Sequence, residues 1–275
     1  MTIYITCRRA ALFLLIGAAA AHAVAGRELR VAFIDCGKGD AIFIKTPSGK
    51  NILLDAGPPN NAEAVVSTLR REKVLQLDAA ILSHPHPDHV GGFEAVFENV
   101  PVAIAYESGR QDSYPEYDQF KEGIKKMRIR RKLLKAGGKV FIDPQLDVQV
   151  LWPPSPDVDE NTNNDSFVLR VVYGRTAILL TGDIEKNAEA GLVGLYGGRL
   201  ESQVMKSPHH GYNTSSTALL LKVVKPRLVV ISTGEGHRPE NAVLKRLARA
   251  GIRVLRTDEA GTVVFVSDGN VWGVK

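Results

Sequence analysis

A histidine-rich segment directly after a predicted strand constrains this chain more than any other feature. Residues 82–92 read Leu-Ser-His-Pro-His-Pro-Asp-His-Val-Gly-Gly, which places four metal-binding side chains within six positions: His84, His86, Asp88 and His89. Neutral imidazole nitrogens and carboxylate oxygens are ligands that Zn²⁺ and similar divalent ions accept. Two prolines restrict how the intervening backbone folds. We therefore expect a metal-binding loop rather than a solvated polar turn.

The first 25 residues have the pattern of a secretory signal peptide. Two arginines precede an apolar run at residues 10–21, and small residues follow, including Ala23 and Ala25. The run is shorter than the roughly 20 apolar residues that a membrane span requires, so we expect cleavage near residue 25 and no stable membrane anchor afterwards. Residues 26–275 are then predicted to form a single domain in a secreted or periplasmic protein. Because Cys7 lies in the signal, Cys36 has no disulfide partner and is expected to be a buried small residue rather than a spare ligand.

The net charge of +5 is unevenly distributed, since residues 121–139 contain nine Lys or Arg and one Glu. We interpret the mature protein as an acidic body with one basic segment. Such a segment can be a solvated face, but it also attracts phosphate backbones through counterion release. Nucleic acid or another phosphodiester is therefore a candidate partner, with Lys125, Arg128 and Arg131 as candidate substrate contacts.

Strand and helix patterns alternate along the mature chain, which predicts an α/β protein with two halves. The longest predicted helix covers residues 115–136 and ends at a Gly-Gly pair. The other predicted helices cover residues 62–71, 184–195, 216–224 and 240–250. Strands are predicted at residues 29–34, 41–46, 51–55, 79–83, 149–152, 167–173, 176–181, 203–206, 227–232, 253–256, 262–267 and 271–274.

Two further strand ends carry the chemistry that the histidine loop lacks. Asp183 follows one apolar strand, and the pair His209 and His210 follows another. Strand-end loops in layered α/β folds can meet at one edge. A carboxylate there can bridge two ions separated by about 3.5–4 Å, as in two-metal hydrolysis. On its own, Asp183 would more commonly cap a helix.

Six segments together resemble the metallo-β-lactamase superfamily, whose diagnostic loop is His-x-His-x-Asp-His. Within it, the chain is most similar to the soluble hydrolase domain of the competence protein ComEC and its exported single-domain relatives. The resemblance implies an αββα sandwich of two mixed β-sheets flanked by helices, with a metal site at one edge between the sheets. The segments that carry it are residues 33–40, 52–57, 84–89, 163–170, 180–185 and 206–211.

The resemblance also implies a ligand set for one or two divalent ions, with zinc expected and manganese or magnesium as alternatives. His84 and His86 would serve one ion and Asp88 and His89 the other. Asp183 would bridge them, and either His209 or His210 would complete the second site. Asp88 and Asp183 are the candidate catalytic carboxylates, because Asp88 could also orient the attacking water.

One position departs from the superfamily pattern. A further histidine usually precedes the strand at residue 167, but residues 162–166 here read Thr-Asn-Asn-Asp-Ser. The ion served by His84 and His86 is therefore expected to be the weaker one. Asn164 could supply an amide oxygen or form a turn. Lys206 could contact an anionic substrate or be a solvated loop charge.

These features predict an exported metal-dependent hydrolase, specifically a phosphodiesterase or nuclease that cleaves DNA with metal-activated water. Two alternatives stay open. The same centre could hydrolyse a small ester, lactone, lactam or phosphocholine-type diester. A non-catalytic binding protein could also retain the fold if the missing histidine disables hydrolysis.

Overall fold

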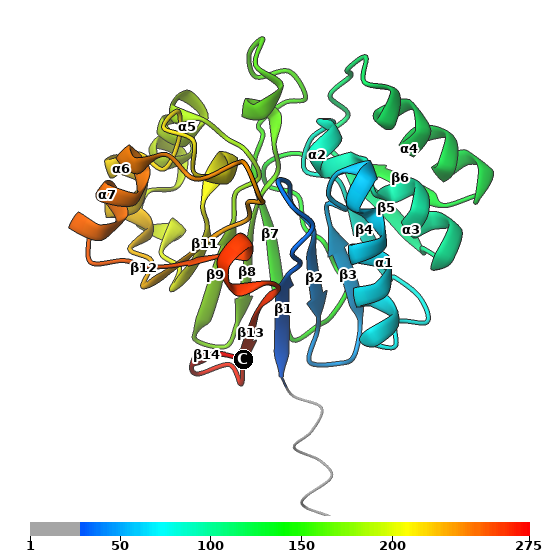
Figure 1. The fold of residues 1–275 in the computed structure, drawn as a ribbon, viewed down its shortest axis with the longest axis horizontal. Coiled ribbons are helices and arrows are strands. Elements are labelled where there is room, and N and C mark those ends of the chain that lie inside the picture. The colour runs from blue at the N-terminus through cyan, green and yellow to red at the C-terminus, as the bar shows by residue number, and fades with distance from the viewer. Residues whose placement is uncertain (1–27) are drawn as a thin grey trace, which may run out of the picture.

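The computed structural model describes residues 28–275, so the predicted signal peptide lies outside the described residues. Two β-sheets pack face to face, and helices cover their outer faces (Figure 1). Helices α1 (Ala62–Arg71), α3 (Phe93–Asn99) and α4 (Pro115–Lys126) lie on one side. Helices α5 (Lys186–Tyr196), α6 (Ala218–Val224) and α7 (Asn241–Arg249) lie on the other. This architecture confirms the predicted αββα sandwich.

The first sheet has eight strands in the order β14-β13-β1-β2-β3-β4-β5-β6. The pairs from β14 to β3 are antiparallel and those from β3 to β6 are parallel. The strands are β1 (Leu29–Phe33), β2 (Ile42–Lys45), β3 (Asn51–Leu54), β4 (Ala79–Ile81), β5 (Ile104–Glu107), β6 (Arg130–Leu133), β13 (Val263–Ser267) and β14 (Trp272–Val274).

The second sheet has six strands in the order β12-β11-β10-β9-β8-β7. Strands β7 to β9 pair antiparallel, and β9 to β12 pair parallel. The bounds are β7 (Asp147–Trp152), β8 (Val168–Tyr173), β9 (Thr176–Leu180), β10 (Val204–Lys206), β11 (Leu228–Ile231) and β12 (Arg253–Arg256). The remaining short helices are η1 (Pro59–Asn61), α2 (Pro87–Val90), η2 (Thr162–Asp165), η3 (Gly197–Leu200), η4 (Pro208–Gly211) and α8 (Thr257–Ala260).

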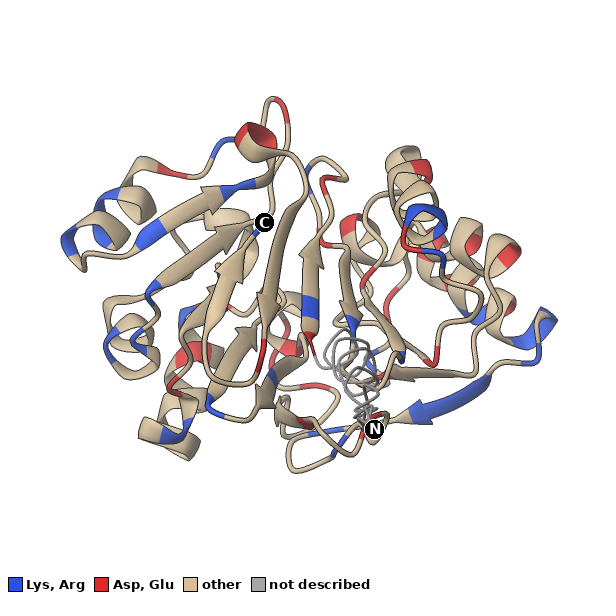
Figure 2. Ribbon diagram, turned by 90° about the horizontal axis from the view of Figure 1, so that it is seen from below, with Lys and Arg blue, Asp and Glu red and all other residues tan. Residues whose placement is uncertain are grey.

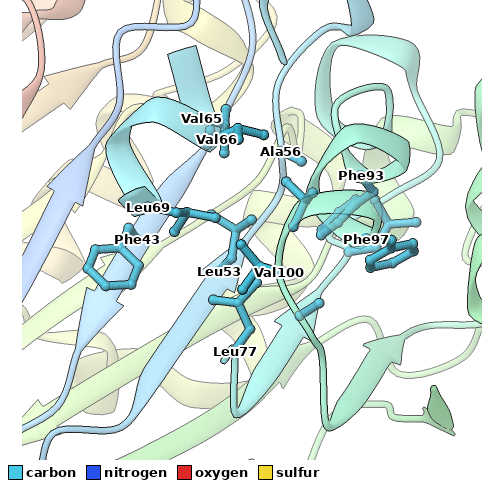
Figure 3. Close-up of a cluster of buried hydrophobic side chains, with 14 of the residues drawn as sticks. Phe43, Leu53, Ala56, Val65, Val66, Leu69, Leu77, Phe93, Phe97 and Val100 are labelled. Carbon is cyan, nitrogen blue, oxygen red and sulfur yellow. The ribbon is translucent and has the colours of Figure 1, made fainter. Parts of the chain in front are cut away.

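Successive side chains along a strand point to opposite faces of the sheet, and apolar residues on both faces explain why both are covered. In β1, Val31 and Phe33 point into the core between the sheets, whereas Ala32 packs in the core beneath the helices. Figure 3 shows the helix-side core, where Phe43 and Leu53 of the sheet meet side chains of α1 and α3. Each fully buried Phe or Leu stabilises the fold by about 1.5–3 kcal/mol, so both layers contribute to stability. Cys36 is also buried, as expected, and burial strongly raises the pKa of its thiol.

The predicted long helix over residues 115–136 is wrong. Helix α4 ends at Lys126, and Arg128 turns the chain through a left-handed conformation with φ of 53°. The chain then forms β6, which pairs in parallel with β5. All four β6 residues are exposed, and such cationic edge strands discourage edge-to-edge pairing. The sequence did not indicate a strand here, because three of its four residues are Arg or Lys and the usual apolar pattern is absent.

The parallel strands position the candidate site. The loops after β4, β9 and β10 all leave the carboxyl ends of parallel strands and meet where the two sheets adjoin. A backbone hydrogen bond of 3.4 Å from His209 N to Gly182 O joins two of these loops. No helix among residues 28–275 is long and apolar enough to cross a membrane.

Candidate metal centre

The histidine loop folds back because a short helix begins within it. Strand β4 ends at Ile81, and α2 begins at Pro87, a residue whose fixed φ suits the first helical position. The turn is closed by a 3.0 Å hydrogen bond from His89 N to His86 O. It brings the His89 ring within 4.2 Å of the His84 ring, measured between centroids.

Two glycines allow neighbouring backbones to press against this loop. A Cβ on Gly39 would lie 2.2 Å from Asp88 O, and one on Gly92 would lie 2.0 Å from Ala56 O. Both distances are far inside van der Waals contact, so only glycine fits. The loop before β2 and the loop after β3 therefore hold the histidine segment rigidly.

Imidazoles and a carboxylate converge at the sheet edge. Asp183 Oδ2 lies 3.2 Å from His89 Nε2 and 3.1 Å from His210 Nε2. The two Nε2 atoms are 3.3 Å apart. Among the sets of donor atoms that lie within 4.8 Å of one another, one comes from His84, His89 and Asp183 and another from Asp88, His89 and His210. The structure thus joins the three strand-end loops that the sequence singled out.

The outer nitrogens of three imidazoles have fixed partners, and that of His84, Nδ1, lies 3.0 Å from Ser83 Oγ. His89 Nδ1 lies 2.8 Å from Asp55 Oδ2, and Asp55 in turn accepts a 2.7 Å hydrogen bond from Ser83 Oγ. His210 Nδ1 donates to the carbonyl oxygen of Ser232 at 2.9 Å. Such contacts orient metal-binding histidines and leave Nε2 to face the ion. The Nε2 atoms of His89 and His210 face Asp183.

The electrostatics of the cluster favour a cation. Burial, reinforced by the charge on His89, lowers the pKa of His84 well below its usual range, which keeps it in the neutral form that binds metals. His84 Nε2 is buried with no hydrogen-bond partner among the described residues. Burial opposes charge on His89, yet Asp183 and Asp55 raise its pKa well above the usual value. The donor set and its negative field fit a divalent ion.

The structure distinguishes the two adjacent histidines. His210 is buried and directs Nε2 into the cluster, whereas His209 is partly exposed. His209 Nδ1 instead lies 3.0 Å from Thr214 Oγ1 and 3.3 Å from Glu185 Oε1. Both histidines adopt left-handed backbone conformations, with φ of 49° and 51°. Non-glycine residues rarely hold that conformation without compensation, which agrees with a functional loop.

Asn164 forms a turn instead of reaching the cluster. It lies in η2, and its Nδ2 donates to Asp159 Oδ2 at 2.7 Å. Its Oδ1 accepts a 2.9 Å hydrogen bond from Glu185 N, which occupies the amide oxygen proposed as a ligand. His86 lies at the more open side of the cluster, with its ring centroid 4.6 Å from that of His84. Among residues 28–275, no imidazole equivalent to His210 lies on this side.

Neither expectation for Lys206 matches the structure, because its side chain is fully buried. Lys206 Nζ lies 2.6 Å from Asp40 Oδ2 and 2.9 Å from Asp183 Oδ1. It also donates to Gly182 O at 2.7 Å. Burial opposes its charge, but the two carboxylates raise its pKa. Lys206 is therefore a positioning residue that holds one oxygen of Asp183 so that the other faces the imidazoles.

Sequence reasoning missed Lys38, Asp40 and Asp55. Asp55 follows the end of β3, the same signal that identified Asp183, whereas Asp40 lies just before the start of β2. Lys38 Nζ lies 2.7 Å from Asp88 Oδ2. Although burial opposes charge on Asp88, nearby His89 and His210 hold the pKa of its carboxyl below the usual range, and Lys38 adds to the effect. Asp88 is thus an anion at the accessible side of the centre.

The predicted contacts on the basic segment lie away from the cluster or have another partner. The ring of Tyr114, just before α4, lies 5.3 Å from that of His86. Lys125 follows eleven residues later along the helix, a rise of about 16 Å, and Arg128 lies beyond it. Arg131 pairs with the buried Glu107.

The comparison with protein families matches this geometry. A profile of the metallo-beta-lactamase superfamily matches residues 34–235, which include every cluster residue. The chain belongs to the metallo-β-lactamase superfamily. It is accordingly a metallo-hydrolase, and members of the superfamily typically bind one or two divalent metals. The individual ligand assignments stay predictions.

Relatives within the superfamily confirm the resemblance to ComEC-type competence proteins. Competence protein ComA of Neisseria gonorrhoeae is 35% identical over 248 residues, covering 89% of this chain and 33% of ComA. ComE operon protein 3 of Bacillus subtilis is 30% identical over 258 residues, covering 86% of this chain and 33% of the relative. The chain therefore spans about a third of the length of these relatives.

A solved structure shows the same fold at low identity. Igni18, a metallo hydrolase from Ignicoccus hospitalis, superposes with a TM-score of 0.55 at 15% sequence identity. The match covers 86% of this chain and 98% of Igni18. At this identity the likeness supports the superfamily fold alone.

Proposed function

We propose that this protein is an exported, zinc-dependent phosphodiesterase that cleaves DNA. The observation that carries the hydrolytic chemistry is the buried cluster of His84, His89, His210 and Asp183, whose donor atoms converge across the two sheets. The competence names of its relatives favour a nucleic-acid substrate over a small ester or lactam. The predicted signal peptide favours a periplasmic or secreted location.

Different residues would bind the metal, orient the water and bind the phosphate. When bound, a divalent ion supplies water with a pKa near 7 and neutralises charge on the phosphodiester. Asp183 and the imidazoles would hold one or two ions, and Asp88 would orient the attacking water. Lys38, half-buried beside Asp88, would bind a phosphate oxygen and balance its charge. The reaction adds water across one P–O bond, with the proton passing to the departing oxygen.

Cleavage assays of the metal-loaded protein test this proposal. Single-stranded DNA, duplex DNA, RNA and bis(p-nitrophenyl) phosphate would be compared at low salt, with and without a chelator. We expect metal-dependent cleavage of DNA that weakens as salt rises, because phosphate contacts release counterions. His86→Ala should reduce the rate, whereas His237→Ala, in an exposed loop, serves as the matched histidine control. Absence of DNA and RNA cleavage would exclude a nuclease.

The same assays separate the remaining alternatives. Turnover of small esters, lactones or lactams without nucleic-acid cleavage would assign the centre to a small substrate. Fewer than one ion per chain together with no hydrolysis would indicate a binding protein. Export is tested by N-terminal sequencing of the protein recovered outside the cytoplasm, where cleavage after Ala23 or Ala25 is expected.

A further inference from the structure

A groove between α6 and α7 has cations on its walls and an apolar floor. Its volume is about 1020 Å³. Leu221, Ala242 and Ile252 are among the apolar residues that line it. No carboxylate occurs among the described residues of its lining, whereas five basic residues do: Lys222, Lys225, Lys245, Arg246 and Arg249. The groove is therefore suited to an anionic occupant.

Three of these cations are available for binding. Lys222, Lys245 and Arg249 are exposed and have no ion-pair partner within residues 28–275. Lys245 and Arg249 are four residues apart on α7, so they lie on the same face of that helix. Lys222, on α6, contributes to the opposite wall. An occupant would thus meet charge from both sides.

The groove is continuous with the loop that carries His210. Asn213, three residues after His210, lines the groove. Arg246 Nη2 donates to Asn213 Oδ1 at 2.8 Å, and Arg246 Nη1 donates to the carbonyl oxygens of Ser215 and Ser216 at 3.0 and 2.8 Å. One basic residue therefore clamps the segment that connects the metal cluster to the start of α6.

This region corrects the expectation of a single basic segment on an acidic body. Residues 222–256 contain nine Lys or Arg and two Glu. Figure 2 shows Lys and Arg at both ends of the long axis, over α6 and α7 at the left and over β6 and α4 at the right. The sequence does not show this second basic region as a charged run, because other residues separate its Lys and Arg along the chain. In the fold, part of it gathers around one groove.

We infer that the α6–α7 groove binds the backbone of single-stranded DNA as it approaches or leaves the metal centre, an inference that rests on the proposed nuclease function. Phosphates would contact the cationic walls, and bases would pack on the apolar floor. A single strand can present its bases to such a floor, whereas the bases of a duplex are paired and stacked inside it. Because the described lining of the groove contains no aromatic side chain, binding should depend strongly on salt and little on sequence.

Binding measured without cleavage tests this inference separately from hydrolysis. The triple variant Lys222→Gln/Lys245→Gln/Arg249→Gln and the unmodified protein would be titrated with fluorescently labelled oligo(dT) in the presence of a chelator. Loss of three phosphate contacts should weaken binding at least about tenfold at low salt. The slope of log K against log salt should fall by about 2, at roughly 0.7 per contact.

A matched variant at the other basic region controls for net charge. Arg130→Gln/Lys132→Gln/Lys135→Gln also removes three exposed cations, and its affinity should stay within about twofold of the unmodified protein. Thermal melting would confirm that both variants fold. Unchanged binding by the groove variant, or an equal loss in the control, would overturn the inference. Stronger competition by duplex DNA or poly-glutamate than by oligo(dT) would also overturn it.

These results remain distinct from those of the cleavage assays. If the protein cleaves DNA while the groove variant binds normally, only the groove assignment fails. If the groove binds oligo(dT) but no phosphodiester is cleaved with metal present, the proposed function fails while the binding surface stands.

Discussion

The candidate ligands on the two sides of the metal cluster differ in how firmly hydrogen bonds hold them. On one side, His89 and His210 have outer nitrogens fixed by Asp55 and Ser232, and their inner nitrogens flank Asp183. On the other side, Ser83 Oγ holds Nδ1 of His84 at 3.0 Å, but His86 lies toward solvent and its ring has no hydrogen-bond partner among residues 28–275. Asn164 turns away to bond Glu185. Fixed ligands lose little freedom on binding, so we expect a tight ion near His210 and a weaker ion near His86.

Asp183→Asn should produce the largest effect because Asp183 serves both sides and is also the partner of Lys206. We expect loss of both ions and a rate reduced by roughly 10³-fold, equivalent to about 4 kcal/mol. Metal analysis and phosphodiester cleavage would be measured on the same preparation. Activity within tenfold of the unmodified protein would show that the carboxylate does not join the two sides.

A paired comparison of His210→Ala and His86→Ala tests the asymmetry directly. His210→Ala should weaken the tighter ion by more than about 100-fold, beyond the range seen for supporting residues. His86→Ala should leave the tighter ion in place and weaken only the second, by about tenfold. Competition against a chromogenic chelator measures both. Equal losses in the two variants would remove the distinction between the sides.

Asp55→Asn should have an intermediate effect because it removes the charge that orients His89. We expect a 10–100-fold loss of affinity for the tighter ion, the usual range for such supporting contacts. Asp78→Asn, near the other end of the sheet beside Lys50, is the matched control. If both variants bind metal like the unmodified protein, Asp55 supports folding alone.

His209→Ala should have the smallest effect on metal affinity. His209 contacts Thr214 and Glu185 at the rim, so its loss should change affinity by no more than about threefold. The same chelator competition provides the measurement. A loss comparable with that of His210→Ala would move the ligand assignment to the neighbouring histidine.

Much of the fold was predictable because its signals are local. Short apolar runs gave β8, β9 and β11 within about two residues, and the histidine loop marked the active edge of the sheets. The edge strand β6 was missed because its Arg and Lys residues hide the usual apolar pattern. Its pairing with β5 is tertiary information that a charged run does not carry.

The convergence of the candidate metal-binding residues was predictable from the sequence, but the residues that position them were not. The histidine loop, Asp183 and the pair His209 and His210 span more than 120 residues of sequence. They were grouped by residue type and strand-end position, and they converge in space. The burial of Lys206 was unforeseen because a lysine after an apolar run ordinarily faces water. Its two carboxylate partners, Asp40 and Asp183, come from different sheets and meet only after folding. The choice between His209 and His210 likewise depended on backbone dihedrals that sequence spacing does not specify.

Metal titration of the chelator-treated protein, with DNA cleavage followed at each addition, tests the central claim most directly. The account predicts two ions bound in sequence, the second at least about tenfold more weakly, and cleavage that rises as the sites fill. Cleavage that proceeds at full rate without any divalent ion would contradict it. So would failure to bind even one equivalent.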